Sequence, residues 1–288
     1  MAMSNYIWKI KFKIDHLLTE RPIKDSSIEF FSPHFPSTEK DKDYTEGELT
    51  ISLSNLNYSA KEIVTEGLRT VIALTNHVNL LVQIISIESP PGVLPSLKME
   101  GSSHSSPLLK EAERIPHLWD KYQMLISNNY RELSYAVQWF MRAIKAQDSI
   151  DKFIYSWISF NMLYGWLAQT RNHIKGIKGL LGKGIPNLRS QKDIVSGNQK
   201  IFEELSRMTL LDACNLYNKN VDRAEKLRKA LQGRDAKEIL IAAIEAIGFI
   251  RHNIFHGNLS NKTAEAERCI WPLIHLNAEI IKNQLEKI

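Results

Sequence analysis

A long apolar segment that ends in two histidines constrains the fold of this 288-residue chain more than any other feature. Between Asp235 and His256, apolar residues recur at spacings of three and four, which predicts a helix with one buried face. These residues are Leu240, Ala243, Ile244, Ile247, Ile250 and Ile254. Asp235 followed by Glu238 is typical of a helix start, and Gly257 predicts a C-terminal cap. We therefore expect a core helix whose last turn reaches the edge of the core.

That last turn carries the sequence Arg251-His252-Asn253-Ile254-Phe255-His256-Gly257. Arg251 continues the apolar row at its edge, where a guanidinium needs a partner because an unpaired buried charge costs several kcal/mol. His256 falls where the helix dipole favours a cation. A histidine that titrates near neutrality is suited to proton transfer.

The spacing of these residues predicts an incomplete site. Arg251 and His256 are five positions apart, which places them roughly 140° apart around a helix, so that they flank its end. His252 and His256 are four apart and share a face. A second copy facing the first across a two-fold axis would supply paired arginines and histidines around one groove. We therefore expect a homodimer.

Charge and cysteine content indicate the compartment and the kind of partner. Residues 1–120 contain 12 basic and 16 acidic residues, whereas residues 121–288 contain 25 and 16. A basic second half suits an anionic partner such as nucleic acid, or else a solvated basic surface. Cys214 and Cys269 form no disulfide or metal-binding pattern, which favours a reducing compartment. With no signal peptide and no membrane span expected, the predicted location is cytoplasmic.

Hydrophobic periodicity predicts two domains. Residues 1–90 show alternating strands and one helix beginning at Ser59, which indicates a small α+β domain. Residues 91–117 are rich in Pro and Ser and predict a linker. Residues 118–288 predict an all-α domain. Its helices are expected at 119–126, 133–144, from Ser149 onward, 200–212, 222–231, 235–256 and from Thr263 onward, the last one kinked by Pro272.

A glycine-rich basic stretch at 171–192 predicts a flexible loop. Its residues Lys175, Lys178 and Lys183 could grip a phosphate backbone, or could be an ordinary solvated surface. It is not a P-loop, since Ile177 stands where a glycine is required and Gly184 where Ser or Thr is required.

Two stretches together resemble the HEPN superfamily, in its ApeA-like branch. RHNIFHG resembles the family's Arg-polar-x-x-x-His motif, and FIYSWISFNMLYGW resembles its early core helix. The resemblance covers about residues 120–288, and residues 1–90 are assigned to no family. It implies an all-α HEPN-like helical bundle acting as a metal-independent endoribonuclease completed by dimerisation, with no cofactor and no metal.

The resemblance also implies roles for individual residues. Arg251 would bind the scissile phosphate of RNA and stabilise its developing charge, and His256 would transfer protons. His252 would orient the substrate, and Asn161, in the middle of the apolar helix that begins at Ser149, would be a supporting hydrogen bonder. Proteins of this kind serve as toxins or in antiviral defence, which allows for an antitoxin or regulatory partner. A second arginine–histidine pair, Arg268 and His275, has similar spacing and is interpreted as coincidental.

Two other functions stay open at this point. The chain could be a non-catalytic RNA- or nucleotide-binding or scaffold protein of the same fold. It could also hold a metal through His252 and His256, although Asn253 replaces the glutamate of an HExxH helix and the third ligand would have to be Glu265 or His275. For the aromatic residues Trp157, Tyr164 and Trp166, we favour a core position over base stacking.

Overall fold

The structure is a computed structural model that describes residues 6–14, 23–24, 28–30, 45–53, 59–77, 82–88, 114–128, 130–208, 222–256 and 262–288. Most of the predicted linker (residues 91–113), Cys214 and the predicted cap Gly257 lie outside these ranges. The chain divides into two compact units, residues 1–128 with the terminal Ile288, and residues 129–287. Within the described ranges, none of the helices has the length and apolarity needed to cross a membrane.

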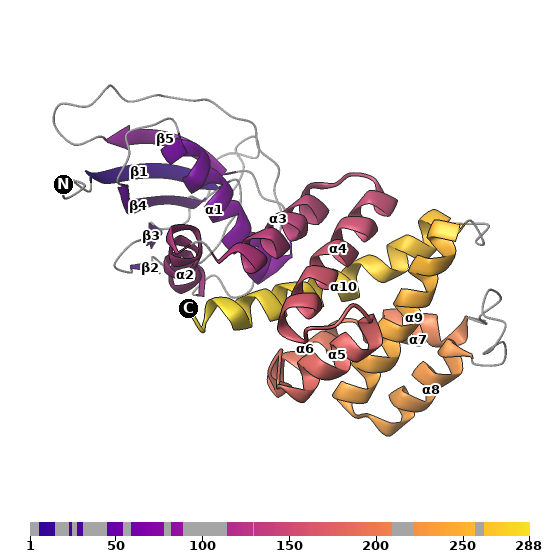
Figure 1. The fold of residues 1–288 in the computed structure, drawn as a ribbon. Coiled ribbons are helices and arrows are strands. Elements are labelled where there is room, and N and C mark those ends of the chain that lie inside the picture. The colour runs from indigo at the N-terminus through magenta and orange to yellow at the C-terminus, as the bar shows by residue number, and fades with distance from the viewer. Residues whose placement is uncertain are drawn as a thin grey trace. The chain divides into compact units, whose positions relative to one another are not determined.

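The first unit contains an antiparallel five-stranded sheet (Figure 1). Its strands are β1 (Tyr6–Ile14), β2 (Ile23–Lys24), β3 (Ile28–Phe30), β4 (Thr45–Leu53) and β5 (Val82–Glu88), in the order β2-β3-β4-β1-β5. In β1, the side chains of Ile10, Phe12 and Ile14 are buried while Lys11 is exposed. This alternation is the half-buried strand that the sequence predicts.

Two helices, α1 (Ser59–Asn76) and α2 (Ile115–Ser127), pack on each other in the same unit. Trp119 of α2 is fully buried. Its ring lies so close to Gly67 of α1 that a Cβ at residue 67 would be 2.5 Å from it. Because α2 buries its tryptophan on α1, the first unit extends to Asn128, beyond the boundary at residue 118 that the sequence suggests.

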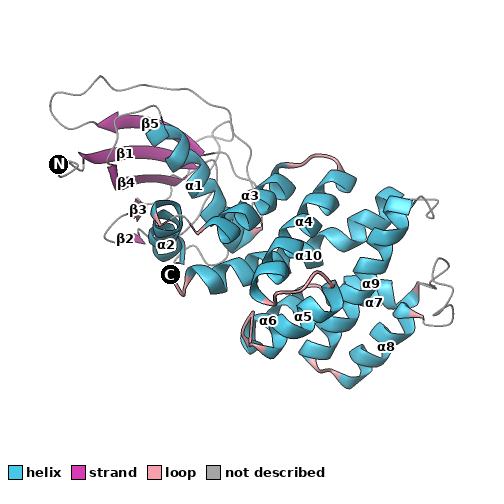
Figure 2. Cartoon of the chain, viewed as in Figure 1, coloured by secondary structure: helices cyan, strands magenta, loops and turns pink. Residues whose placement is uncertain are grey.

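In the described residues of the second unit, every element is a helix, as predicted for this half (Figure 2). Helix α4 (Ser149–Leu167) packs against both α3 (Arg131–Lys145) and α10 (Lys262–Leu285). The Ser159 hydroxyl donates to the Ala136 carbonyl of α3 at 2.9 Å, and the Asn277 amide of α10 donates to the Ser156 carbonyl at 2.8 Å. These buried bonds fix α4 between its neighbours.

Helix α9 (Ala236–His256) is the central element of this unit. It contacts α5 (His173–Gly182), α6 (Leu188–Gly197), α7 (Gln199–Arg207), α8 (Arg223–Gly233) and α10. The Asp235 carboxylate accepts the Glu238 backbone N–H at 3.0 Å, which confirms the predicted start. Residues 239–250 are buried on all sides, so the expectation of a single buried face was too narrow. Surrounding helices cover the whole circumference, which a helix can tolerate when it is apolar all round.

The prediction of a flexible loop over residues 171–192 is wrong. Helix α5 begins after Asn172, whose side chain accepts the Lys175 N–H, and α6 begins after Asn187, whose side chain accepts the Ser190 N–H. Gly176, read from the sequence as a source of flexibility, instead lets α5 approach α4. A Cβ there would lie 2.6 Å from the Tyr164 ring.

Glu245 is the one carboxylate within the buried part of α9. Its side chain contacts the Lys226 ammonium of α8 and lies 3.7 Å from the Arg223 guanidinium. Glu245 is 8% exposed, so its charge relies on these two cations.

We expect Glu245→Ala to lower the free energy of unfolding by about 2 kcal/mol, because two cations of α8 would lose their shared carboxylate. The expected loss of stability is smaller than that for breaking a fully buried ion pair, because the Lys226 side chain is 46% exposed. Urea denaturation followed by circular dichroism measures it. Glu225→Ala, which removes an exposed carboxylate paired with Lys229, is the matched control and should cost at most about 0.5 kcal/mol. Equal losses in the two variants would contradict the assignment.

Candidate functional site around Arg251

Arg251 lies in the last turns of α9 and is half-buried. Its guanidinium carbon is 4.7 Å from the centroid of the Phe255 ring, one turn further on. The Nε atom is buried, yet it donates no hydrogen bond to any residue that the structure describes. A cation–π contact leaves the N–H donors at the edge of the guanidinium available. Arg251 Nε is therefore a buried donor without a partner among the described residues, at the point where the core helix ends.

The turn before Arg251 is packed by a histidine that sequence reasoning did not select. His173, the first residue of α5, presses its imidazole on the α9 backbone at Gly248, where a Cβ would collide with Nε2. The ring also contacts Trp157 of α4, edge to face, with the centroids 5.4 Å apart. A glycine at 248 is the sequence signal that could have suggested a close approach, but it does not say by which residue.

Burial lowers the pKa of His173 below its usual value of 6.5. Glu245 opposes this shift and the positive charge of Arg251 adds to it, so His173 lies within electrostatic reach of both charges. The imidazole is therefore neutral at pH 7. Because its Nε2 edge is packed against α9, we interpret His173 as a residue that positions the turn leading to Arg251.

Tyr164 of α4 also faces this charge. Its side chain is 5% exposed, and burial raises the pKa of its phenol while Arg251 opposes the rise. The hydroxyl group donates to the Arg171 carbonyl at 3.4 Å, in the segment leading to α5. Trp157 is buried too, and Trp166 is half-buried. The core interpretation of Trp157 and Tyr164 is thereby confirmed.

Asn161 lies on the same face of α4 as Trp157 and Tyr164, at spacings of four and three. Its Oδ1 atom is buried and accepts no hydrogen bond from the described residues, although a buried amide was expected to have a partner. Arg251 Nε on α9 and Asn161 Oδ1 on α4 are thus a buried donor and a buried acceptor, each without a partner among the described residues.

The two histidines of the motif are placed only in part. His252 is half-buried on α9, and the backbone of His256 forms the last residue of the helix, while its side chain lies outside the described residues. His275, considered as a third metal ligand, has its Nδ1 3.1 Å from the Asn198 amide, between α6 and α7.

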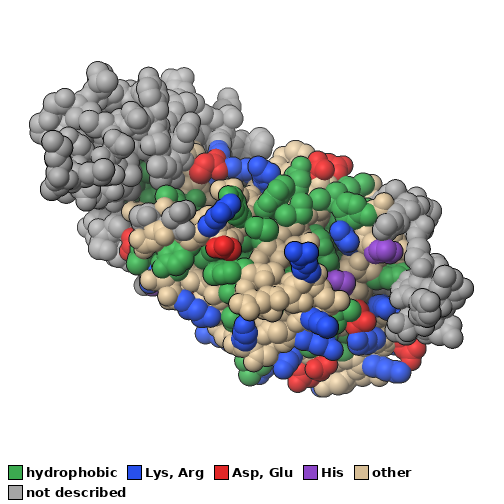
Figure 3. All heavy atoms as spheres, viewed as in Figure 1, with side chains coloured by type: hydrophobic (Ala, Val, Ile, Leu, Met, Phe, Trp, Pro, Cys, Tyr) green, Lys and Arg blue, Asp and Glu red, His purple; other side chains and the backbone are tan. Residues whose placement is uncertain are grey.

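The three candidate lysines differ in what they contact. Lys175 and Lys178 are exposed on α5. The Lys183 ammonium donates to the Leu167 carbonyl at 2.6 Å, at the C-terminus of α4, where a cation is favoured by the helix dipole. On the face drawn in Figure 3, basic side chains of the helical unit are dispersed among apolar and acidic ones. Lys183 therefore has a structural contact that Lys175 and Lys178 lack in the described part of the chain.

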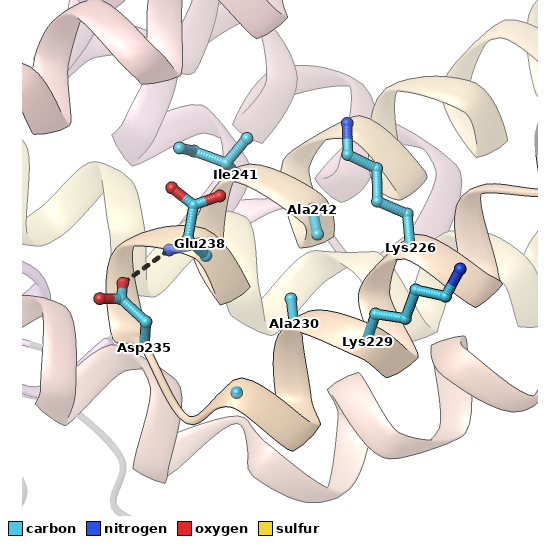
Figure 4. A pocket seen from close by; sticks show the side chains of 8 residues that line it. Lys226, Lys229, Ala230, Asp235, Glu238, Ile241 and Ala242 are labelled. Carbon is cyan, nitrogen blue, oxygen red and sulfur yellow. Dashed lines mark hydrogen bonds between the residues drawn. The ribbon is translucent and has the colours of Figure 1, made fainter.

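A shallow pocket of about 320 Å³ lies at the opposite end of α9, between α8 and α9 (Figure 4). It is lined by both acidic and basic groups, namely Asp235, Glu238, Lys226 and Lys229, together with apolar residues such as Ile241. Ala242, the lining residue furthest along α9, is nine residues before Arg251, or about 14 Å along the helix axis. The pocket is thus separate from the Arg251 site.

No protein-family model, no curated protein and no solved structure matches the chain. The chemistry of the side chains around Arg251 is therefore the basis for proposing a function.

We expect Gly248→Ala to destabilise the fold by roughly 1–3 kcal/mol, because the new methyl group would displace the His173 imidazole. The measurement is urea denaturation. Gly165→Ala in α4 is the matched control, since the nearest atom to its added Cβ is the Thr170 carbonyl oxygen at 3.9 Å. That change should stabilise the helix by up to about 1 kcal/mol. A Gly248→Ala protein as stable as the wild type would refute the packing described here.

We expect His173 to make stability depend on pH. Its folded-state pKa lies below the unfolded value near 6.5, so the unfolded chain takes up the proton first as the pH falls. The contribution is therefore present above pH 6.5 and is lost as the pH falls towards the folded-state pKa. Between about pH 7.5 and about pH 5.5, the wild type should lose more stability than His173→Gln. His117→Gln, at an exposed histidine, is the control and should follow the wild type.

Proposed function

We propose that this protein is a metal-independent endoribonuclease in which Arg251 binds the scissile phosphate. The observation that carries the proposal is the half-buried Arg251, whose Nε has no partner among the described residues. A guanidinium at the edge of a core, with one donor that no described residue satisfies, suits a phosphate, which accepts such bonds in pairs. The HEPN-like motif supports the same proposal, as do the helices of the described residues between 130 and 287.

The proposed reaction is an internal transesterification of RNA. The ribose 2′-oxygen attacks the phosphorus and loses its proton to a base, while the bond to the 5′-oxygen breaks and that oxygen gains a proton. His256 is the proposed proton-transfer residue, and in a homodimer the two copies could act as base and acid. Arg251 would stabilise the charge developing on the phosphate oxygens.

The remaining residues would hold the substrate. The exposed Lys175 and Lys178 would contact phosphates at some distance from the scissile bond, whereas Lys183 would first have to leave the Leu167 carbonyl. Asn161 Oδ1 would accept a hydrogen bond from the substrate or from an ordered water. His252 would orient the RNA. Service as a toxin or antiviral effector, in the cytoplasm, is part of the same proposal.

We expect the purified wild-type protein to cleave total cellular RNA in excess EDTA, leaving 2′,3′-cyclic phosphate and 5′-hydroxyl ends. Arg251→Ala and His256→Ala should each lower the rate by roughly 100-fold or more. Arg251→Lys should recover part of the activity, since an ammonium keeps the charge but not the paired donors.

Arg268→Ala is the control, because Arg268 precedes a histidine at similar spacing but lies outside the proposed site. With the fold verified by circular dichroism, it should retain wild-type activity. Cleavage that survives in both Arg251→Ala and His256→Ala would assign the activity elsewhere or to a contaminant. Binding of RNA by a folded dimer without any cleavage would replace the proposal with a non-catalytic RNA-binding function.

A further inference from the structure

Helix α3 has an exposed face that the Arg251 site does not use. Its buried residues lie on one side of the helix and pack on α4 and α10. The opposite side carries Arg131, Tyr135, Trp139 and Arg142, at successive spacings of four, four and three, which place them in one row. Arg131, Tyr135 and Arg142 are exposed and Trp139 is half-buried.

Each arginine of this row lies over one of its rings. The Arg131 guanidinium lies 5.6 Å from the centroid of the Tyr135 ring, and that of Arg142 lies 4.4 Å from the Trp139 ring. Tyr155 of α4 extends the row sideways, its ring 5.6 Å from that of Trp139. Figure 3 shows apolar side chains, tyrosine and tryptophan included, gathered over α3 and α4.

The charge of the row is positive. Neither Arg131 nor Arg142 forms an ion pair with a described residue, although the charge of Glu132 acts on Arg131. Lys145 adds a third cation in the last turn of α3, against one carboxylate, Glu132, in the first turn. Across the row, Asp151 of α4 lies four residues before Tyr155. The surface therefore combines planar π-systems with two exposed guanidinium groups.

We propose that this row, formed by Arg131, Tyr135, Trp139, Arg142 and Tyr155, binds single-stranded nucleic acid. Bases would stack on the tyrosine, tryptophan and guanidinium planes, and the arginines would neutralise phosphates. Arg131 and Arg142 are eleven positions apart, or about 16 Å, which is room for about five nucleotides at stacked spacing. We take RNA rather than DNA as the natural ligand, and this choice rests on the proposed ribonuclease function.

Single strands fit this row better than a duplex or a protein. A duplex hides its base faces, so it could use the arginines but not the rings. A protein partner covering the row would have to supply carboxylates for two exposed arginines. A polyanion with flat bases meets both requirements of the surface with one ligand.

The test uses the full chain carrying Arg251→Ala, so that cleavage cannot consume the probe. Its affinity for a fluorescent, unstructured RNA of about 20 nucleotides is measured by anisotropy in EDTA, with a single-stranded DNA and an RNA duplex of equal length as parallel probes. Adding Tyr135→Leu and Trp139→Leu should weaken RNA binding by roughly tenfold or more. Tyr135→Phe with Trp139→Phe keeps the rings and should keep the affinity.

The arginines give a second readout that does not depend on buried packing. Arg131→Gln with Arg142→Gln should reduce the slope of log affinity against log salt by about 1.4, since single-strand binding loses about 0.7 for each phosphate contact. Lys192→Gln with Arg207→Gln removes two exposed cations elsewhere and should leave the slope unchanged.

The outcomes separate this inference from the proposed function. Unchanged RNA affinity in both the leucine and the glutamine variants would overturn it, as would duplex binding equal to single-strand binding. Loss of a dimer in the leucine variants, with RNA affinity intact, would mean that the row is a protein interface. Equal binding of RNA and DNA would keep the surface but remove RNA as its particular ligand. Strong RNA binding, together with no RNA cleavage by the wild-type protein, would contradict only the ribonuclease proposal.

Discussion

The helical unit depends on the burial of α9. A helix that is apolar around its whole circumference must be surrounded, and α5, α6, α7, α8 and α10 all contact it. Burial on this scale leaves little freedom for the last turns of α9. Arg251 is held where the covered part of the helix ends, with a donor that no described residue satisfies. A packed core thus holds a guanidinium at its boundary, an arrangement that would support the proposed phosphate-binding role of Arg251.

Close backbone approaches at two glycines bring the other helices to this boundary. Gly248 admits the His173 imidazole to α9, and Gly176 admits the Tyr164 ring to α5. At each glycine, an aromatic ring occupies the space that the methyl group of an alanine would need. The requirement for glycine at both positions therefore comes from residues elsewhere in the sequence. Trp157 completes the contact by packing on His173. The charge of Arg251 on α9 therefore acts on side chains of two neighbouring helices, Tyr164 of α4 and His173 of α5.

Local patterns allowed part of this to be predicted. The Asp235 cap, the extent of α9 and the burial of Ile244 and Ile247 follow from signals within one segment. The α5–α6 segment was misread because its glycines suggest flexibility when no neighbour is known, whereas Gly176 and Gly179 are required by close packing against α4 and the residue that follows it. His173 could not be selected for the same reason, since its importance arises from Gly248, seventy-five residues away. Tertiary contacts of this kind leave no periodicity in the sequence.

The contacts of Glu245 have a consequence for the motions of the unit. Among the described residues of α8, Ala224 and Leu227 are the buried ones, so this helix has a small apolar contact area. Its attachment to α9 draws instead on Lys226 and Arg223, which share one carboxylate. Ionic strength weakens such attractions where a partner is exposed, as Lys226 is, whereas it leaves apolar burial intact. Local opening of the unit is therefore expected to begin with α8 moving away as one piece, while the other four helices continue to enclose α9.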